Sequence, residues 1–508
     1  MSLPLFESRT LRATLHDVGG LLLIPGSVAL TAVVVALVAG ETHTLPGFGI
    51  AIGASVVVGG GLRVLARPAP GEPPPDALGT VAVALGWIGA AAIAALPFGF
   101  YGLGSPPTAN TAAYGTFWNA MFEGMSALTS TGLSVADDAS ELPRAMQWWR
   151  TALEWVGGMG VALLALTLTK AGLDRGALVT AEINVGRLVK ESDNPVRRLW
   201  VIYVALTAFS IGVMWVAGMP FWEALNHGAT GIATGGFSVT SDSFQSYGAA
   251  IKAVTIVVMV LGALDFAVYA RASLGGRPLA IVRDPATRWL AACLVVGGLA
   301  LWGITAARGD AGSALDDAFI WASALGTCGF ASVDLSEWSG AAWMWLIAAM
   351  FVGAAAGSTG GGLKTRRAAL LLANVWWRVR ERHGDEIETY RFGGEDLEPL
   401  AAFDRLAKAA ALATVFVVTL VLGALALMLF EGDAHTPMAL FFEAASGLGA
   451  VGLSSGVTSA ELGDPAKAVL VTLMWLGRLE VMAALMIVAE AFLPHGEHEG
   501  IHRDEEAR

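Results

Sequence analysis

Four short segments of the chain share a glycine-centred pattern. They read FEGMSALTSTGLS (122–134), NHGATGIATGGFS (226–238), FIWASALGTCGFA (319–331) and FEAASGLGAVGLS (442–454), and they align without a gap. Glycine has no Cβ atom, so it can present its carbonyl group in conformations that other residues avoid. Four such segments around one axis predict a ring of backbone oxygens, and rings of this kind replace the hydration shell of a monovalent cation.

The candidate filter segments are the shared glycine of each repeat and the two residues before it. Their members are Ser130, Thr131, Gly132, Thr234, Gly235, Gly236, Thr327, Cys328, Gly329, Ala450, Val451 and Gly452. The alternative is that each glycine only caps a helix, which is a common role for glycine. The flanking residues also match, however: Glu123 aligns with Glu443, and Ser126 aligns with Ser323 and Ser446. The pattern therefore favours one repeated ion site over four unrelated loops.

Each segment must be positioned by helices that cross a membrane. The chain has 508 residues, 55% hydrophobic and only 15% charged, whereas soluble proteins carry about 25% charged residues. A bilayer-spanning helix needs about 20 apolar residues, and ten runs approach that length. They lie near residues 20–40, 47–65, 79–98, 148–169, 199–218, 249–270, 289–306, 343–377 (interrupted), 410–430 and 466–492. The four glycine segments are too short to span, so each should dip into the membrane and return.

The distribution of basic residues predicts the orientation of these runs. Most of the 31 Lys and Arg residues lie in the two ends of the chain and in alternate connections, which places both termini on the cytoplasmic side. The first apolar run begins late and lacks a small-residue cleavage site, so it indicates a span and not a signal peptide. Six basic residues lie elsewhere: Arg144, Arg150, Lys252, Arg308 and Lys467 near the opposite face, and Arg478 inside the last run.

Composition excludes several other classes of protein. The net charge is −12 and no basic run is present, so nucleic-acid binding is not expected. Cys293 and Cys328 are too few and too far apart for a disulfide framework or a zinc site. The connections on the opposite face are acidic and would concentrate cations there.

The eighth apolar run is interrupted by a glycine-rich loop. Its residues are Gly357, Ser358, Thr359, Gly360, Gly361 and Gly362. Consecutive glycines disfavour a helix by about 1 kcal/mol each, and irregular backbone at membrane depth is tolerated where it faces a cavity or is buried. A phosphate-binding loop is a poor alternative, because Leu363 occupies the required lysine position. A simple kink for helix packing remains a second interpretation.

Charged residues inside apolar runs are the remaining candidates. Arg478 needs hydration or a partner such as Glu480 or a carbonyl group. Glu123 and Glu443 are placed to accept hydrogen bonds from backbone N–H groups near the filter segments. Four other carboxylates could be structural or carry protons: Glu154, Asp265, Asp317 and Glu490. The histidine-containing tail, 495–502, is expected to be a solvated tail and not a metal site.

The fourfold plan resembles the Trk/Ktr/HKT superfamily of potassium transporters, most closely its TrkH/TrkG-type subunits. The filter sequences TGLS, TGGFS, CGFA and VGLS carry this resemblance, together with AGSTGGGLKTRR (356–367) and GRLE (477–480). It implies an all-α membrane protein with four span, pore helix, span repeats around one ion pore, preceded by two extra transmembrane helices. The implied units are residues 1–77, 78–190, 191–283, 284–400 and 401–508.

The resemblance also implies a function. The chain would take up K⁺, and accept Rb⁺, across the cytoplasmic membrane, with potassium bound at the filter residues. The 357–362 loop would be the gate and Arg478 a barrier on the axis below the filter. Symport, a homodimer, lipid contacts and a cytosolic TrkA-like RCK/KTN ring are implied as well. The chain itself has no GxGxxG unit, so ATP, ADP or NAD would act only through that partner, and no cofactor is expected in this chain.

The resemblance leaves some differences open. Gly235, Cys328 and Val451 stand where the first segment has Thr131. Members of the HKT branch that prefer sodium have Ser at the first filter glycine, whereas this chain has Gly132. Two other classes remain as alternatives: a secondary transporter of another cation or of a small organic solute, and a membrane enzyme that uses Glu154, Asp265 or Glu490. Because all four segments enter from one face and no nucleophile or metal motif is present, both are less favoured, and an enzyme is not expected.

Overall fold

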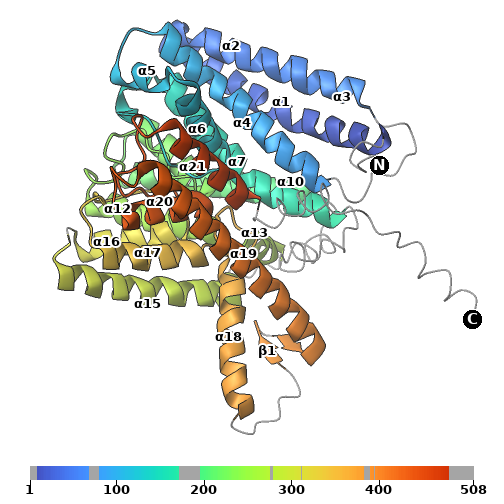
Figure 1. Ribbon diagram of the computed structural model, residues 1–508, viewed down its shortest axis with the longest axis vertical. Helices are drawn as coiled ribbons and strands as arrows, with labels where there is room; N and C mark the ends of the chain where they lie inside the picture. Colours follow the sequence, from blue (N-terminus) through green and yellow to red (C-terminus); the bar gives the residue numbers. More distant parts are fainter. Residues whose placement is uncertain are drawn as a thin grey trace, which may run out of the picture.

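The computed structural model describes residues 8–67, 79–170, 195–274, 279–310, 312–382, 390–393 and 395–479, and this part of the chain is mostly helical (Figure 1). The run predicted for 466–492 is described only as far as Leu479. Glu480, Glu490 and the 495–502 tail therefore lie outside the described residues.

Two long helical elements precede the repeats. The first is α1 (Ser8–Ala39); the second runs without interruption through α2 (Leu45–Ala54), the π-helical segment η3 (Ser55–Gly60) and α3 (Gly61–Leu65), after the short turn η2 (Thr42–Thr44). The two pack closely, since a Cβ atom added to Gly19 would lie only 2.6 Å from the carbonyl oxygen of Gly59. Both also contact α4, so this pair lies against the first repeat (Figure 1).

Four helical units follow, each with a first helix, a short pore helix and an inner helix. The first unit consists of α4 (Gly79–Gly104), α6 (Phe117–Leu128) and α7 (Arg144–Lys170), with the small elements α5 (Ala109–Tyr114) and η4 (Ala139–Glu141) between them. The second consists of α10 (Pro195–Val216), α11 (Phe221–Ala233) and α12 (Ala249–Ala263). The third consists of α15 (Pro285–Arg308), α16 (Ala314–Leu325) and α17 (Gly340–Val352). The fourth consists of α19 (Pro399–Glu431), α20 (Pro437–Gly449) and α21 (Asp464–Arg478).

The units are packed in a closed cycle. Each inner helix contacts the pore helix of the next unit: α7 contacts α11, α12 contacts α16, α17 contacts α20, and α21 returns to α6. Each pore helix also packs on the first helix of its own unit. The four pore helices are therefore surrounded by longer helices and are almost fully buried. After each pore helix the chain returns to the same side of the helical body. We call this side the outer side, because the distribution of basic residues predicts that it faces away from the cytoplasm.

The prediction of one continuous span over 249–270 is wrong. The chain turns by 89° between α12 and α13 (Phe266–Leu274). Leu264 is extended at the end of α12, and the Asp265 carboxylate accepts a hydrogen bond of 2.8 Å from the Ala267 amide, so it caps the new helix. A second short helix, α14 (Leu279–Arg283), follows. Within the described ranges, six helices are long and apolar enough to cross a membrane, and the bent pair makes a possible seventh.

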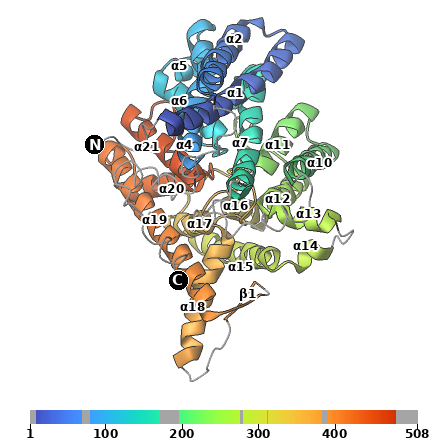
Figure 2. The same cartoon turned by 90° about the vertical axis from the view of Figure 1, so that its right-hand side faces the viewer.

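The eighth run is interrupted, as predicted, but its second half is longer than expected. After α17 the chain is irregular until α18 (Thr365–Arg382), which extends beyond Trp377. A hairpin that the sequence did not predict follows, in which β1 (Tyr390–Phe392) pairs antiparallel with β2 (Glu395–Leu397). Figure 1 and Figure 2 both show α18 and β1 projecting from the helical body, beside the first turns of α19.

Candidate functional site

The four candidate filter segments have the same backbone conformation. The shared glycines have φ of 89° at Gly132, Gly236 and Gly329 and 95° at Gly452. Two residues earlier, Ser130, Thr234, Thr327 and Ala450 all have φ between 49° and 52°. Non-glycine residues seldom adopt positive φ, so its occurrence at the same place in four units is a property of the repeat. The gapless alignment of the sequences is therefore matched by an alignment of the backbone.

Each segment is held by its own pore helix. The residue before each glycine donates its amide to a carbonyl in the last turns of that helix: Thr131 to Ser126, Gly235 to Thr230, Cys328 to Ser323 and Val451 to Ser446, at 2.8–2.9 Å. In the first and fourth units the glycine amide also donates to a serine hydroxyl, Ser126 at 3.1 Å and Ser446 at 3.0 Å. Because these N–H groups are used on the helix side, the carbonyl oxygens of the segments are the groups left for an ion.

The four glycines form a closed ring. A Cβ atom added to Gly132 would lie 2.1 Å from the Gly235 carbonyl oxygen, and one added to Gly236 would lie 2.3 Å from that of Cys328. One added to Gly329 would lie 2.3 Å from the carbonyl oxygen of Val451, and one added to Gly452 would lie 2.2 Å from that of Thr131. Each glycine therefore packs against the backbone of the next segment, and the fourth returns to the first. A side chain at any of the four positions would push neighbouring segments apart.

A cavity of about 260 Å³ opens on the outer side of this ring. It is lined by all four glycines and by the residues that follow them, including Ser134, Ser238 and Ser454. Asp137 and Asp334 also line it. A cation in this cavity would meet backbone and hydroxyl oxygens and two carboxylates, which are the ligands that hard cations prefer.

Glu123 and Glu443 accept the backbone hydrogen bonds that the sequence predicted. Glu123 accepts from the Val135 amide and Glu443 from the Ser455 amide, each at 3.0 Å and each three residues after the filter glycine. In the second unit the aligned residue is His227, whose Nε2 accepts from the Val239 amide at 3.4 Å. One position on three pore helices thus supports the outer end of the filter segment. In the third unit this position is Ile320.

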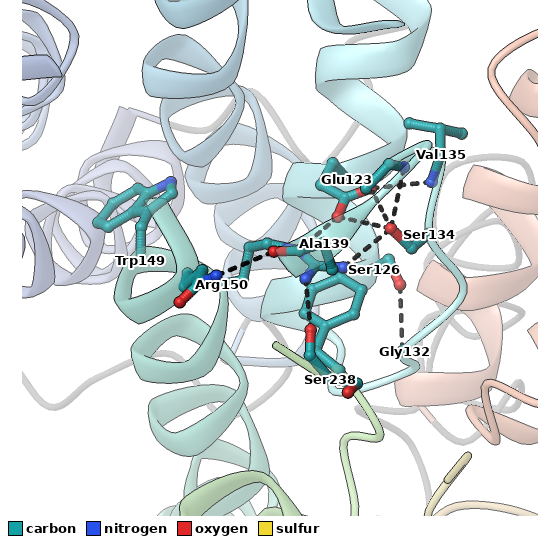
Figure 3. Close-up of polar contacts among 12 residues, drawn as sticks. Glu123, Ser126, Gly132, Ser134, Val135, Ala139, Trp149, Arg150 and Ser238 are labelled. Atoms are coloured by element: carbon teal, nitrogen blue, oxygen red, sulfur yellow. Dashed lines mark hydrogen bonds and ion pairs between the residues drawn. The ribbon is translucent and has the colours of Figure 1, made fainter. Parts of the chain in front are cut away.

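Arg150 is a residue that the sequence analysis placed only near the opposite face. The structure buries it beside Glu123, with 2.7 Å between Arg150 Nε and Glu123 Oε1, and only 2% of the arginine side chain is exposed (Figure 3). It also lines the outer cavity. The available signal was a basic residue on the side of the membrane where the other connections are acidic, seven residues into an apolar helix. The sequence did not indicate which carboxylate it would contact.

The glycine loop, residues 357–362, lies on the other side of the ring and contacts three units. Thr359 donates to the carbonyl oxygens of Ile232 (2.9 Å) and Gly262 (3.1 Å) in the second unit. Gly361 donates its amide to Thr327 Oγ1 at 2.7 Å, and a Cβ atom at Gly361 would lie 2.1 Å from the Gly449 carbonyl oxygen. The loop is therefore packed directly beneath the candidate filter segments.

The break between α12 and α13 accommodates this loop. The Ala355 amide donates to the Ala263 carbonyl at 3.0 Å, and the Phe266 amide donates to the Gly357 carbonyl at 3.1 Å. A Cβ atom at Gly357 would lie 2.5 Å from Asp265 Oδ1, so Asp265 lines the bend that receives the loop. Lys364, which follows the loop, is buried and donates to the Gly360 carbonyl.

Arg478 is buried next to the loop. Its Nη1 donates to the Thr359 carbonyl at 3.1 Å, and its Nη2 donates to the Gly157 carbonyl in α7. Of the two partners that the sequence left open, the described residues supply carbonyl groups, whereas Glu480 lies outside them. Since Thr359 contacts the second unit and Arg478 joins the loop to the first and fourth, the two residues bring elements of all four units together below the ring.

Two further candidate carboxylates, Glu154 and Asp317, have structural partners. Both oxygens of Glu154 lie 3.2–3.3 Å from the Phe237 amide, and a Cβ atom at Gly235 would lie 2.5 Å from its carboxylate. Asp317 accepts from Thr305 Oγ1 at 3.0 Å. Glu154 therefore supports the second filter segment from behind, and Asp317 joins the third pore helix to α15. Among the described residues, no group of three or more His, Cys, Asp or Glu side chains is arranged to hold a metal ion.

Apolar spanning helices, four returning pore helices and a closed ring of backbone define a multi-pass membrane protein of the ion-transport class. Comparisons with known proteins agree. Residues 102–500 match the TrkH family, described as a cation transport protein. The chain is 33% identical over 390 residues to the Trk system potassium uptake protein TrkH of Vibrio parahaemolyticus, covering 74% of this chain and 79% of that one. It is 28% identical over 397 residues to TrkG of Escherichia coli, with the same coverage.

A solved structure agrees over a larger part of the chain. The crystal structure of the potassium transporter TrkH from Vibrio parahaemolyticus superposes with a TM-score of 0.79 at 26% identity, covering 95% of this chain and all of that one. The chain therefore belongs to the TrkH family of cation transport proteins, as its filter sequences predicted.

Proposed function

We propose that this chain takes up potassium ions across the cytoplasmic membrane through the ring of four filter segments. The observation that carries the proposal is the closure of the ring, in which Gly132, Gly236, Gly329 and Gly452 each pack against the next segment. The relatives named as potassium uptake proteins support the choice of ion. Both termini would be cytoplasmic, and the membrane potential would drive uptake with about 2.3 kcal/mol per charge per 100 mV.

In this proposal the groups that bind the ion are backbone carbonyls and not side chains. The side chains of Gly235, Cys328 and Val451 differ from that of Thr131, yet all four residues donate the same amide hydrogen bond to their pore helices. Their carbonyl groups would bind the ion, so the side-chain differences need not change the ring. The negative ends of the four pore helices add a field that favours a cation.

The 357–362 loop would be the gate. It lies directly beneath the ring, and its contacts with Ile232, Gly262 and Thr327 hold it there. Arg478 would add a positive charge to the same place and raise the barrier for cations. Opening would require the loop to leave these partners, which a rearrangement of α18 could produce because α18 directly follows the loop.

A cytosolic partner would supply that rearrangement. The projecting α18 and the β1–β2 hairpin carry Arg378, Arg380 and Arg382 and offer a surface outside the helical body (Figure 2). A TrkA-like RCK/KTN ring that binds ATP, ADP or NAD is the partner proposed for this surface. The chain would work as a homodimer in a lipid bilayer, and symport with H⁺ or Na⁺ is part of the same proposal.

The test is ⁸⁶Rb⁺ uptake into proteoliposomes with K⁺ or Na⁺ as competitor. We expect K⁺ to inhibit uptake at far lower concentration than Na⁺, Gly132→Ser to weaken that preference and Arg478→Ala to raise uptake. Gly212→Ser is the matched control, because a Cβ atom at Gly212 in α10 meets nothing within 4 Å. Uptake that stays absent in folded protein even after the loop is deleted would contradict the proposal and favour a secondary transporter of another cation or of an organic solute.

A further inference from the structure

Arg150 and Glu123 form a buried ion pair beside the ring, on its outer side. The pair is 2.7 Å long, with 2% of the arginine side chain and none of the glutamate exposed. Two charges in such a place are costly unless further hydrogen bonds satisfy them. The partners of the guanidinium therefore show what the pair holds together.

The guanidinium contacts the residues that directly follow two neighbouring filter segments on the outer side. Arg150 Nη2 donates to Ser134 Oγ at 2.9 Å, two residues after Gly132, and Arg150 Nη1 donates to the Ser238 carbonyl at 2.9 Å, two residues after Gly236 (Figure 3). Its carbon Cζ also lies 4.0 Å from the centre of the Phe237 ring. Because the guanidinium is planar and its donors are fixed relative to one another, these contacts set the distance between the equivalent positions of the first two segments.

Within the described part of the chain, the aligned glutamate of the fourth unit has only partners of its own unit. Glu443 accepts hydrogen bonds from Ser454, Ser455 and Thr458, which are neutral donors of its own unit. The closest counterpart is Lys252 in α12, which lies 2.8 Å from Asp316 Oδ1 and donates to the Ser332 carbonyl of the next unit at 3.3 Å. Lysine is a single charged point on a flexible chain, so it does not fix two segments as the arginine does.

We propose that Arg150 is a positioning residue for ion selectivity, which acts by holding the outer ends of the first and second filter segments at a fixed separation. This inference rests on the proposed potassium uptake through the ring. A Cβ atom at Gly132 would lie 2.1 Å from the Gly235 carbonyl oxygen, so these two segments are in direct contact on the axis side. Arg150 links the same two segments on the outer side through Ser134 and Ser238. A ring held at both places keeps its carbonyl oxygens at the spacing that fits K⁺. The smaller Na⁺ would need these oxygens to move inward, so it is excluded.

The decisive variant removes both charges together, Glu123→Gln with Arg150→Met. Removing one partner alone would leave an unpaired buried charge and could unfold the protein, whereas replacing a buried pair is often tolerated. The measurement is ⁸⁶Rb⁺ uptake, with the ratio of the Na⁺ and K⁺ concentrations that halve it. This ratio does not depend on how much protein folds. We expect it to fall about tenfold, a factor within the range of coupling between contacting side chains.

Two further variants separate a positioning role from a general structural one. Arg271→Met with Asp284→Asn removes a second ion pair, of 3.0 Å, that lies away from the ring, and should leave the ratio unchanged. Ser134→Ala removes one contact of Arg150 without leaving Glu123 unpaired, and should lower the ratio by a smaller factor. It serves as the test if the double variant does not fold.

The possible results are distinct. If the wild type is selective and the double variant has the same ratio, the role of Arg150 is overturned and the proposed function stands. If the double variant does not fold, an unchanged ratio in Ser134→Ala has the same meaning. A wild type whose uptake K⁺ does not inhibit overturns both. An equal fall in the Arg271 and Asp284 control would also overturn the inference, since loss of any ion pair would then be sufficient.

Discussion

Gly452 packs against Thr131 so closely that a Cβ atom at Gly452 would lie 2.2 Å from the Thr131 carbonyl oxygen. This contact joins the last unit of the chain to the first and completes the ring. It also explains why α21 contacts α6, the pore helix of the first unit. A closed ring has no free edge, so a change at one glycine must displace the neighbouring segment as well.

Gly452→Ala is therefore expected to abolish most K⁺-inhibited ⁸⁶Rb⁺ uptake. Gly452 has φ of 95°, where a side chain is strained, and the new methyl group would overlap the Thr131 carbonyl oxygen. The strain alone costs about 1–2 kcal/mol. Gly212→Ala in α10, where a Cβ atom meets nothing within 4 Å, is the control and should keep full uptake. Equal uptake by the two variants would show that the ring does not carry the ion.

The threonine of the glycine loop gives a test of gating. Thr359 Oγ1 shares its one proton between the Ile232 carbonyl (2.9 Å) and the Gly262 carbonyl (3.1 Å), and it accepts from Thr234 Oγ1 at 3.2 Å. Thr359→Val keeps the shape but loses these bonds, which contribute about 1 kcal/mol each to the seated loop. We expect basal ⁸⁶Rb⁺ uptake to rise, by up to roughly 30-fold if two bonds of this strength hold the loop closed.

Thr414→Val is the matched control for the loop variant. Thr414 is an exposed residue of α19 whose hydroxyl donates only to the Ala410 carbonyl in its own helix. Its replacement should leave uptake unchanged. Lower uptake in Thr359→Val than in this control would mean that the loop supports the open pathway and does not block it.

Two substitutions of Arg478 separate its charge from its hydrogen bonds. The guanidinium reaches both the Thr359 and the Gly157 carbonyls, whereas a lysine keeps the charge but reaches only one. If charge forms the barrier, Arg478→Lys should behave as wild type and Arg478→Met should raise ⁸⁶Rb⁺ uptake. If the hydrogen bonds hold the loop, both variants should raise uptake, and Arg478→Lys should raise it less because lysine keeps one of the two bonds. Unchanged uptake in both would remove Arg478 from the pathway.

The sequence predicted the parts of the backbone that repeat. The Gly132 segment could be aligned with its three copies because all four segments need a glycine in the same backbone conformation. The lengths of the apolar runs located the helices. The 89° turn at Leu264 and Asp265 was missed, since its cause is the loop that the third unit inserts against the second. Hydropathy contains no information about such a contact.

The role of Arg150 was missed for a related reason. The sequence placed it only near the opposite face, with no partner. Its burial depends on Glu123 in α6 and on Ser238 in the next unit, which only the closed packing of the units brings together. The hairpin of β1 and β2, in which Tyr390 pairs with Leu397, was missed because three-residue strands are too short for a periodic signal.

The ion pair of Lys252 and Asp316 gives a prediction about pH. Burial alone would raise the pKa of Asp316, but hydrogen bonds from Lys252 and Ser313 outweigh it and lower the pKa from 3.8 to about 2. A carboxylate with a lowered pKa stabilises the folded state above its unfolded pKa and stops doing so as the pH falls through its folded pKa. Asp316 therefore stabilises the outer side throughout the range from pH 8 to about pH 4.

Thermal unfolding of Asp316→Asn checks this. The variant should melt below the wild type by a constant difference from pH 8 to about pH 5, and the difference should narrow only below about pH 4. Asp404→Asn is the control, because Asp404 contacts Lys408 on the exposed surface of α19 and such a surface pair contributes little to stability. A difference that disappears already near pH 6 would mean that another group controls this contact.

The packing of α15 on the third pore helix gives the last prediction. A Cβ atom at Gly297 would lie 1.9 Å from the indole of Trp321, whose Nε1 donates to the Cys293 carbonyl at 3.0 Å. The Trp321 indole cannot move away from Gly297 without losing that hydrogen bond, so Gly297→Ala should destabilise the protein by about 1–3 kcal/mol. Gly303 in the same helix has nothing within 4 Å of an added Cβ atom. Gly303→Ala should therefore be neutral or slightly stabilising, because alanine favours a helix over glycine by up to about 1 kcal/mol. Equal melting temperatures for the two variants in detergent would show that α15 can move away from α16, and that the third filter segment does not depend on this contact for its position.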